Sequence, residues 1–334
     1  MRRNWLTMLT AAALLTGLCL PAAASESPAQ TPVQPLMASA GFFDLPRDHW
    51  AYAPVMRLQS AGVIAVDPGG RFRPNDPVSR SELLKMVLAA RHIDPGLECA
   101  GVFADVPCWA WYAPYVETAF RMAITDGQSE WNFAPNAAVT RQELFTVIVR
   151  VLGRRWEAAN LDWGEIRQAL GGFADEPDIS GWAEPALALA VRESLAAGYA
   201  DRTFHPTATA TRAEAATAVS RILLPAEQAG RVRIDGRNVA FARSLELTAS
   251  AFATGEPGVG TETYTGIRVR PGTVAVDPRI IPLGRLLYVQ GYGYSIAADI
   301  GGGIKGDRID LFTRDYDEAA YGFGLQQRMV WVLP

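Results

Sequence analysis

The sequence contains three copies of one spaced pattern, and this internal repeat limits the possible folds more than any other feature. In each copy a tryptophan is followed 22 positions later by a phenylalanine and 8 positions after that by an arginine. Self-similarity of this kind is typical of repeat architectures, in which neighbouring units share one core. The repeated residues are Trp50, Phe72 and Arg80, then Trp111, Phe133 and Arg141, then Trp182, Phe204 and Arg212.

Each copy has the pattern of two short helices joined by a turn. In the first copy Val55 and Leu58 have helical spacing, and Gly62 ends that helix. After the turn, Ser79 and Glu82 have the spacing of a capping box, and the other two copies have threonine and glutamate at the equivalent positions. A unit of this size cannot bury its own apolar face, so we expect the three units to share a core.

An arginine directly follows the capping residue in every copy. A cation at a helix N-terminus opposes the helix dipole, so helix capping explains the glutamate better than it explains the arginine. An arginine beside the free backbone N–H groups of a first turn can instead bind an anion. We therefore consider Arg80, Arg141 and Arg212 as candidate anion-binding residues.

Residues 41–224 resemble three S-layer homology (SLH) repeats. The resemblance rests on the Phe-x-Asp openings, the tryptophans, the Phe-x-Pro turns and a Thr-Arg-Ala-Glu signature that is complete at residues 211–214. It implies an all-α helical repeat trimer with pseudo-threefold symmetry, whose grooves bind pyruvylated secondary cell-wall polysaccharide. The three arginines would contact the acidic ketal of that polymer. The residues near its sugar would be Trp50, Trp111 and Trp182.

The three copies are not identical, so their grooves need not be equivalent. Ser79 replaces threonine in the first copy, and the second has Asp126-Gly127 without the family's tyrosine. In the third copy Arg202 stands where the last glycine of a turn is expected. The arginines are 61 positions apart between the first two copies and 71 between the last two. We expect the extra residues to form a helix around residues 156–170.

After Pro225 the helical periodicity gives way to short β-type runs separated by glycine and proline. About a hundred residues of this kind suggest a small closed β-barrel. The predicted strands are residues 232–234, 239–241, 245–248, 273–276, 286–289, 309–312 and 329–333.

Two aspartates stand on either side of a glycine-rich turn in this β-region. Asp310 lies between Ile309 and Leu311, so in a strand it points away from both and faces a groove if they face the core. Asp299 precedes Ile300 and three glycines, where the backbone must turn sharply or allow a ligand to approach. Paired carboxylates perturb each other's pKa, as proton transfer to a sugar requires. Calcium is the alternative, but two carboxylates are too few oxygen ligands.

Residues 245–334 resemble the three-aspartate (3D) domain and are similar to the catalytic barrel of membrane-bound lytic transglycosylase A and the stationary-phase survival muralytic proteins. The resemblance rests on residues 272–278, 281–284, 291–293 and 298–311. It implies a double-psi β-barrel with Asp310 as catalytic acid and Asp299 as its supporting carboxylate. The implied reaction cleaves the β-1,4 bond between N-acetylmuramic acid and N-acetylglucosamine, leaves a 1,6-anhydro end and needs no cofactor.

Other residues have more than one interpretation. Asp277, the third aspartate of the family's pattern, binds substrate or holds the Val-Asp-Pro turn. Lys305 contacts a substrate carboxylate or Asp299, or is an ordinary surface lysine, and Thr265 would line the glycan groove. Cys99 and Cys108 form a local disulfide or stay as two thiols. The histidines do not have a metal-ligand spacing, so we expect no metal site.

The N-terminus and the charge define the setting. Residues 1–24 predict a signal peptide, with a basic start, an apolar run and an Ala-x-Ala cleavage site, and an uncleaved anchor is the alternative. Residues 25–40 read as a disordered leader. A net charge of −4 argues against a nucleic-acid partner. The predicted folded parts are SLH repeats at 41–94, 101–153 and 171–224 and a 3D domain at 231–334.

Together these features predict a secreted, wall-associated peptidoglycan lytic transglycosylase without a transmembrane anchor after signal cleavage. Its partners would be peptidoglycan glycan strands and the pyruvylated wall polymer. The alternative is a non-catalytic S-layer or cell-wall protein that is structural or binds glycan without cutting it.

Overall fold

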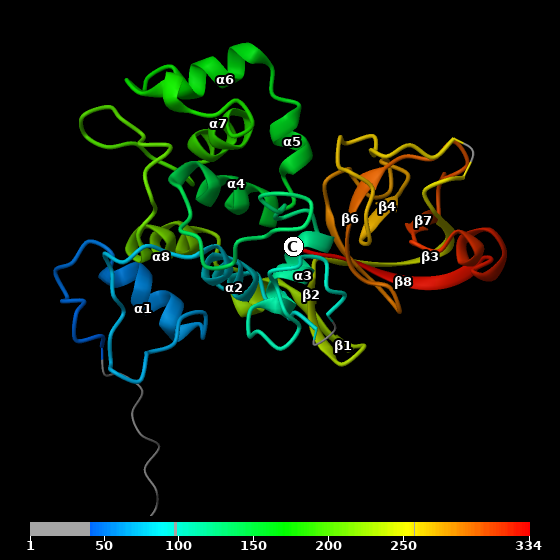
Figure 1. Ribbon diagram of the computed structural model, residues 1–334, viewed down its shortest axis with the longest axis horizontal. Helices are drawn as coiled ribbons and strands as arrows, with labels where there is room; N and C mark the ends of the chain where they lie inside the picture. Colours follow the sequence, from blue (N-terminus) through cyan, green and yellow to red (C-terminus); the bar gives the residue numbers. More distant parts are fainter. Residues whose placement is uncertain (1–40, 97–98, 257) are drawn as a thin grey trace, which may run out of the picture. The chain divides into compact units, whose positions relative to one another are not determined.

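A computed structural model describes residues 41–96, 99–256 and 258–334. The predicted signal peptide and leader lie outside these residues. Along the described chain a helical part is followed by a β part, drawn from blue to green and from yellow to red in Figure 1. The prediction of helical repeats followed by a closed β-barrel is confirmed at this level. Within the described ranges, no helix is long and apolar enough to cross a membrane.

Each repeat contributes two helices, and the second begins at the repeated arginine. Ser79, Thr140 and Thr211 each accept the backbone N–H of a glutamate three residues later, and the glutamate accepts the capping residue's N–H in return. The three predicted capping boxes are therefore confirmed. The helices are α1 Tyr52–Ser60 and α2 Arg80–Ala90, α3 Ala113–Arg121 and α4 Arg141–Val151, and α7 Glu184–Arg192 and α8 Arg212–Arg221.

The aspartate of each Phe-x-Asp opening holds the Phe-x-Pro turn of its own repeat. Asp44 accepts the backbone N–H groups of Phe72 and Arg73, both at 2.8 Å. Asp105 and Asp175 make the same pair of contacts in the second and third repeats. The residue after each phenylalanine has a φ of 53–59°, in the left-handed region that is unfavourable for a side chain. Two charge-assisted hydrogen bonds offset this strain.

The turns before the second helices of the three repeats meet in a closed ring of hydrogen bonds. Val139 donates its N–H to Val78, Ala210 donates to Val139, and Val78 donates to Ala210, over 3.0, 2.8 and 3.1 Å. All three side chains are buried. Each repeat therefore contacts both others at one point, and their helices share one apolar core.

The insertion between the second and third repeats forms two helices, α5 Arg155–Ala159 and α6 Trp163–Leu170. The prediction of one helix around residues 156–170 was wrong. Asp162 has an extended backbone with ψ 163° and accepts the N–H of Glu165, so it starts a new helix where the first has already ended. Short helical turns also occur at η1 Glu176–Asp178, η2 Ala226–Gln228 and η3 Glu318–Gly322.

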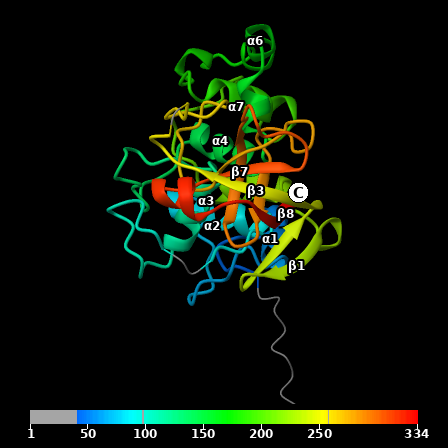
Figure 2. The ribbon, with the colours of Figure 1, turned by 90° about the vertical axis from the view of Figure 1, so that its right-hand side faces the viewer.

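Six strands close into a barrel in the order β3-β7-β4-β6-β5-β8. The pairs β3/β7 and β4/β6 are parallel and the others are antiparallel. Figure 2 shows β3 and β8 side by side, as their pairing requires. The strands are β3 Arg243–Phe252, β4 Thr273–Ala275, β5 Leu286–Val289, β6 Gly293–Asp299, β7 Arg308–Phe312 and β8 Gln326–Val332.

The strand prediction differs from the structure in two places. β6 was not predicted, because small residues such as Ser295, Ala297 and Ala298 have a weak β-propensity. The first two predicted strands, β1 Gly230–Ile234 and β2 Arg237–Phe241, form a separate two-stranded hairpin. Its Asp-Gly turn has positive φ at both residues, which is the geometry of a tight hairpin.

The barrel has two apolar faces. Residues such as Val274, Ile309 and Val330 fill its interior. On the outside of the barrel, Tyr294 and Trp331 belong to the same buried cluster as the helices of the repeats. The helical part and the barrel are therefore joined by a common core.

Candidate functional site

Asp310 is held on the outer face of the barrel by strand alternation. Its neighbours Ile309 and Leu311 are buried in the barrel interior, and Asp310 is only partly buried, as the sequence pattern predicts. β3 runs parallel to β7 with Ser250 in register with Asp310. The Ser250 hydroxyl donates to Asp310 Oδ1 at 2.7 Å.

A β-bulge brings Asp299 into line with Asp310. Val274 pairs with Ala297 on β6, but the next residue, Ala275, pairs with Asp299, so β6 has one extra residue at this point. Ala275 also pairs with Asp310 on its other side. Neighbouring strands lie about 4.8 Å apart, so the two aspartates are about 10 Å apart at Cα. Bulges re-aim side chains in this way, and here the bulge gives Asp299 the same register partner as Asp310.

A loop between β3 and β4 covers the Asp299 side of the site. The backbone N–H groups of Tyr264 and Ile300 both donate to Asp299 Oδ1 at 2.9 Å. The Thr265 hydroxyl donates to the carbonyl of Ala298 at 2.9 Å. The structure therefore brings Thr265 next to Asp299, and its predicted contact with glycan stays a prediction.

The glycines after Asp299 form a tight turn, in which Ile304 donates its N–H to the carbonyl of Gly301 at 3.1 Å. A Cβ at Gly301 would come within 2.5 Å of the Ile304 side chain, so glycine is needed there for space. Lys305 follows this turn and is exposed. Its suggested contact with substrate remains a prediction.

The environment of Asp310 favours its neutral form. Burial raises the pKa of the Asp310 carboxyl above its ordinary value, the Ser250 hydrogen bond lowers it, and the nearby charges of Glu256 and Asp299 raise it further. Glu256 was missed from the sequence. It follows β3, and only the pairing of β3 with β7 shows that it lies near Asp310.

Asp277 has a different environment from the other two aspartates. Its side chain is buried and accepts hydrogen bonds from the Arg279 guanidinium and from the backbone N–H groups of Arg279 and Gly306. The Arg279 side chain and these N–H groups hold the pKa of the Asp277 carboxyl far below its usual range. These internal contacts favour the turn-holding role of the two that the sequence left open.

Two of the cavities near the barrel strands bear on the position of the site. One of about 570 Å³ is lined by Phe312, which follows Asp310 by two residues on the same strand face, and by the exposed Trp131 of the second repeat. A larger one of about 860 Å³ has Arg121, Tyr292 and Tyr321 in its lining, which does not include Asp299 or Asp310. We centre the site on the aspartates, because their chemistry and not cavity size defines it.

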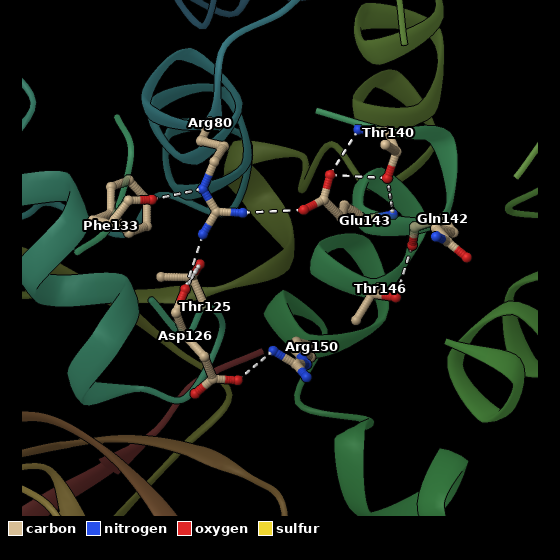
Figure 3. Close-up of polar contacts among 9 residues, drawn as sticks. All are labelled: Arg80, Thr125, Asp126, Phe133, Thr140, Gln142, Glu143, Thr146 and Arg150. Carbon is tan, nitrogen blue, oxygen red and sulfur yellow. Dashed lines mark hydrogen bonds and ion pairs between the residues drawn. The ribbon is translucent and has the colours of Figure 1, made fainter. Parts of the chain in front are cut away.

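The repeated arginines join neighbouring repeats. Figure 3 shows Arg80 with its Nε donating to the carbonyl of Phe133 at 3.0 Å and its Nη1 paired with Glu143 at 3.3 Å. Its Nη2 donates to the carbonyl of Asp126 at 2.9 Å. The guanidinium also lies over the Phe133 ring.

The same contacts continue around the three repeats. Arg141 donates to the carbonyl of Phe204 and pairs with Glu214, both at 2.9 Å. Arg212 closes the cycle by donating to the carbonyl of Phe72 and pairing with Glu82, both at 2.8 Å. Each arginine thus has an internal role that the sequence did not reveal. Their predicted contact with a polymer ketal stays a prediction.

The tryptophans that open the three repeats, Trp50, Trp111 and Trp182, are exposed. Trp50 and Arg141 line one groove of about 240 Å³ together with Tyr199 and Glu214 of the third repeat. The Tyr199 hydroxyl donates to Glu214 at 2.5 Å, and burial together with this carboxylate raises the pKa of Tyr199 to about 12. At the second tryptophan, the Lys85 ammonium lies 5.5 Å from the ring centre of Trp111. The structure therefore brings one of the three candidate tryptophans and one of the three candidate arginines into a common groove.

The turn of the second repeat contacts the barrel. Asp126 forms ion pairs with Arg150, Arg155 and the barrel's Arg270, two of them at 2.9 Å. Burial raises the pKa of Asp126, but these arginines hold it at about 2.

In the third repeat Arg202 has a φ of 67° at the position where glycine was expected.

Cys99 and Cys108 form a disulfide with an S–S distance of 2.16 Å. It joins the segment before the second repeat to the opening of that repeat, across nine positions of sequence. The buried Glu117 carboxylate accepts the N–H groups of Ala100 and Val102 in the same segment, at 3.0 and 3.2 Å.

Comparisons with known families agree with both resemblances. The S-layer homology domain matches residues 42–84, 102–145 and 172–216, and the 3D domain matches residues 272–334. The two resemblances inferred from the sequence are therefore confirmed.

Individual relatives match parts of the chain. Amylopullulanase of Thermoanaerobacterium thermosulfurigenes is 28% identical over 186 residues, which are 56% of this chain and 10% of that protein. The cell wall-binding protein YocH of Bacillus subtilis is 38% identical over 106 residues, which are 30% of this chain and 37% of that protein. MltA of E. coli with bound chitohexaose is 24% identical, covers 24% of this chain and 29% of its own, and has a TM-score of 0.19. The chain thus spans only a minor part of each relative's length.

Proposed function

We propose that this chain, which carries three S-layer homology repeats and a 3D domain, cleaves the glycan strands of peptidoglycan at the cell surface. The SLH repeats associate it with the surface. The single observation that carries the proposal is the setting of Asp310, a partly buried carboxyl with a raised pKa whose strand neighbour Ala275 also pairs with Asp299. A carboxylic acid that stays protonated near neutral pH is what cleavage of a glycosidic bond needs.

The proposed reaction is that of a lytic transglycosylase. Asp310 gives its proton to the oxygen that links N-acetylmuramic acid to N-acetylglucosamine, and the bond from that oxygen to the muramic C1 breaks. An oxocarbenium-like centre forms at C1. The muramic C6 hydroxyl attacks C1 and returns its proton to Asp310, which leaves a 1,6-anhydro end. The negative charge of Asp299 helps to keep Asp310 protonated at the start.

One titrating carboxyl can serve both steps, so no separate nucleophilic carboxylate is required. Retaining glycosidases, by comparison, need two carboxyl groups about 5 Å apart. Asp299, which shares the register partner Ala275 with Asp310, takes the supporting role. We further propose that the closed six-stranded barrel has double-psi topology and that residues 231–334 are the catalytic domain.

The helical part is proposed to be the wall anchor. We infer a pseudo-threefold trimer from repeats at 41–94, 101–153 and 171–224, which binds pyruvylated secondary cell-wall polysaccharide. The groove that contains Trp50 and Arg141 supports this role, because an aromatic ring and a guanidinium suit an acidic sugar. Chemical removal of pyruvyl groups from isolated walls should abolish binding of the whole chain. Unchanged binding would contradict the ketal contact.

The cleavage proposal is tested by incubating the purified protein with isolated sacculi and analysing the products by mass spectrometry. We expect anhydro-muropeptides from the wild type and a decrease of about 10²–10⁴-fold with Asp310→Asn. Asp307→Asn is the matched control, since Asp307 is exposed in the turn before β7. Products with free reducing ends would indicate hydrolysis. The absence of any product would favour the non-catalytic wall protein.

A further inference from the structure

The insertion between the second and third repeats brings a tryptophan to the edge of the candidate site. Trp156 belongs to α5, the first helix of this insertion. The helix contacts the barrel loop that ends at Gly284: a Cβ on Gly284 would lie 2.9 Å from the Trp156 Cβ. No side chain larger than hydrogen fits at Gly284 without a shift, so the loop and the helix are in direct backbone contact.

The Trp156 ring packs against an aromatic ring of the barrel. Its centroid lies 5.6 Å from that of Tyr264, with 47° between the ring planes. Tyr264 is the residue whose backbone N–H donates to Asp299 Oδ1 at 2.9 Å. One residue therefore contacts both the supporting carboxylate and the helical insertion.

This aromatic pair is open to solvent. The Tyr264 side chain is 58% exposed, and Trp156 is only partly buried. A contact whose purpose was to lock the helix onto the barrel would bury both rings, as the core clusters do. Rings of tyrosine and tryptophan have a large apolar face and a polar edge, which suits a ligand with the same mixture. The C–H face and the hydroxyl edge of a pyranose ring have that mixture.

We propose that Trp156 and Tyr264 form a sugar-binding subsite that holds a pyranose ring of the glycan on the Asp299 side of the cleaved bond. This rests on the proposed function for the identity of the glycan as a β-1,4-linked amino sugar polymer. The helical part is then more than an anchor, because its insertion supplies one of the two aromatic rings of the subsite. Both residues position the substrate and take no part in proton transfer.

The test measures glycan binding in a protein that cannot cut. The full chain with Asp310→Asn is titrated with a hexamer of β-1,4-linked N-acetylglucosamine, and the Kd is measured by calorimetry. Adding Trp156→Ala should raise the Kd about tenfold, which corresponds to the loss of about 1.4 kcal/mol when the ring that would stack on the sugar is removed. Tyr264→Ala should raise the Kd by a similar factor through loss of the ring alone, because the backbone N–H that donates to Asp299 is kept.

Trp163→Ala is the matched control. Trp163 lies on α6 of the same insertion and is 60% exposed, so its loss should leave the Kd unchanged. Trp156→Phe keeps an aromatic ring at this position and should therefore restore most of the affinity. It separates loss of the ring from a disturbance of α5 by alanine. An unchanged Kd with Trp156→Ala, or an equal loss with Trp163→Ala, would overturn the proposal.

Cleavage assays separate this inference from the function on which it rests. In the protein with Asp310 intact, Trp156→Ala should raise KM for glycan strands about tenfold, leave kcat nearly unchanged and still yield the same products. If the wild type cuts nothing but binds the hexamer in a Trp156-dependent way, the subsite stands and the reaction fails. If no form of the protein binds the hexamer, the subsite is refuted.

Discussion

Asp299 and Asp310 have the same register partner, because Ala275 pairs with Asp299 of β6 on one side and with Asp310 of β7 on the other. The residue that lies between the two aspartates across the strands is therefore Ala275, whose side chain is only a methyl group. In the proposed reaction, a bulky residue there would occupy space above the sheet that the sugar needs. The relationship depends on the extra residue in β6, since without that bulge Ala298 would stand opposite Ala275.

The groups around Asp310 predict opposite shifts in the pH dependence of cleavage. A general acid must be protonated, so activity falls as pH rises through the raised pKa of Asp310. Glu256→Gln removes a charge that raises this pKa, so the alkaline limb should move to lower pH. Ser250→Ala removes a hydrogen bond that lowers the pKa, so the limb should move to higher pH. Product formation from sacculi across pH 4–9 checks both, and shifts in one common direction would refute the assignment.

Replacing Asp310, the proposed catalytic acid, should make the protein more stable at neutral pH. The pKa of Asp310 is higher in the folded protein than in the unfolded chain, mainly because of burial. When the pH rises from the pKa of Asp310 in the unfolded chain to its pKa in the folded protein, Asp310 loses its proton in the unfolded chain first. The free energy of unfolding therefore falls through this pH range and stays lower above it. Asp310→Asn removes this penalty. Urea titrations should show a higher free energy of unfolding for Asp310→Asn than for the wild type at pH 8. The difference should disappear at a pH below the pKa of Asp310 in the unfolded chain, and a less stable variant at pH 8 would contradict the prediction.

The inter-repeat arginines should differ in their contribution to stability. The Arg141 side chain is 7% exposed and its partner Glu214 is 17% exposed, whereas Arg212 and Glu82 are 16% and 34% exposed. Removing one partner of a buried pair leaves an uncompensated charge, at a cost of about 3 kcal/mol. We expect Arg141→Ala to approach that loss in the free energy of unfolding and Arg212→Ala to lose less. The reverse order in urea titrations would show that burial does not decide the contribution.

The third repeat can be stabilised at the end of its first helix. Ser194 has a φ of 56° and is exposed, and the equivalent residue in the first repeat is Gly62, with a φ of 73°. A side chain in the left-handed region costs about 1 kcal/mol, so Ser194→Gly should add roughly 0.5–1 kcal/mol to the free energy of unfolding. Gly62→Ala is the reciprocal control and should lose a similar amount. Equal stability of all three proteins would indicate that neither position is strained.

Features decided by near neighbours could be predicted from the sequence. The capping boxes at Ser79, Thr140 and Thr211 depend on residues three positions apart, and each formed as the pattern indicates. The outward orientation of Asp310 follows from the two-residue period of a strand and the apolar residues on either side. The three repeats could be identified because their spacing is a property of the chain itself.

Features that depend on pairing between distant segments needed the tertiary structure. The weak β-propensity of β6 hid the strand that carries Asp299, and the bulge that sets its register exists only because β6 pairs with β4. Glu256 comes near Asp310 because β3 lies beside β7. The cycle of contacts from Arg80, Arg141 and Arg212 requires each repeat to meet the next one.

The sequence by itself therefore indicated the repeat architecture, the resemblance of its two parts to SLH repeats and a 3D domain, and the outward orientation of Asp310, since motifs and local spacing carry these features. Tertiary structure alone decided that Asp299 shares a partner with Asp310, that the arginines join neighbouring repeats and that Trp156 reaches Tyr264. Strand register and contacts between segments more than 100 residues apart, such as the ring contact of Trp156 with Tyr264, arise only when the chain has folded.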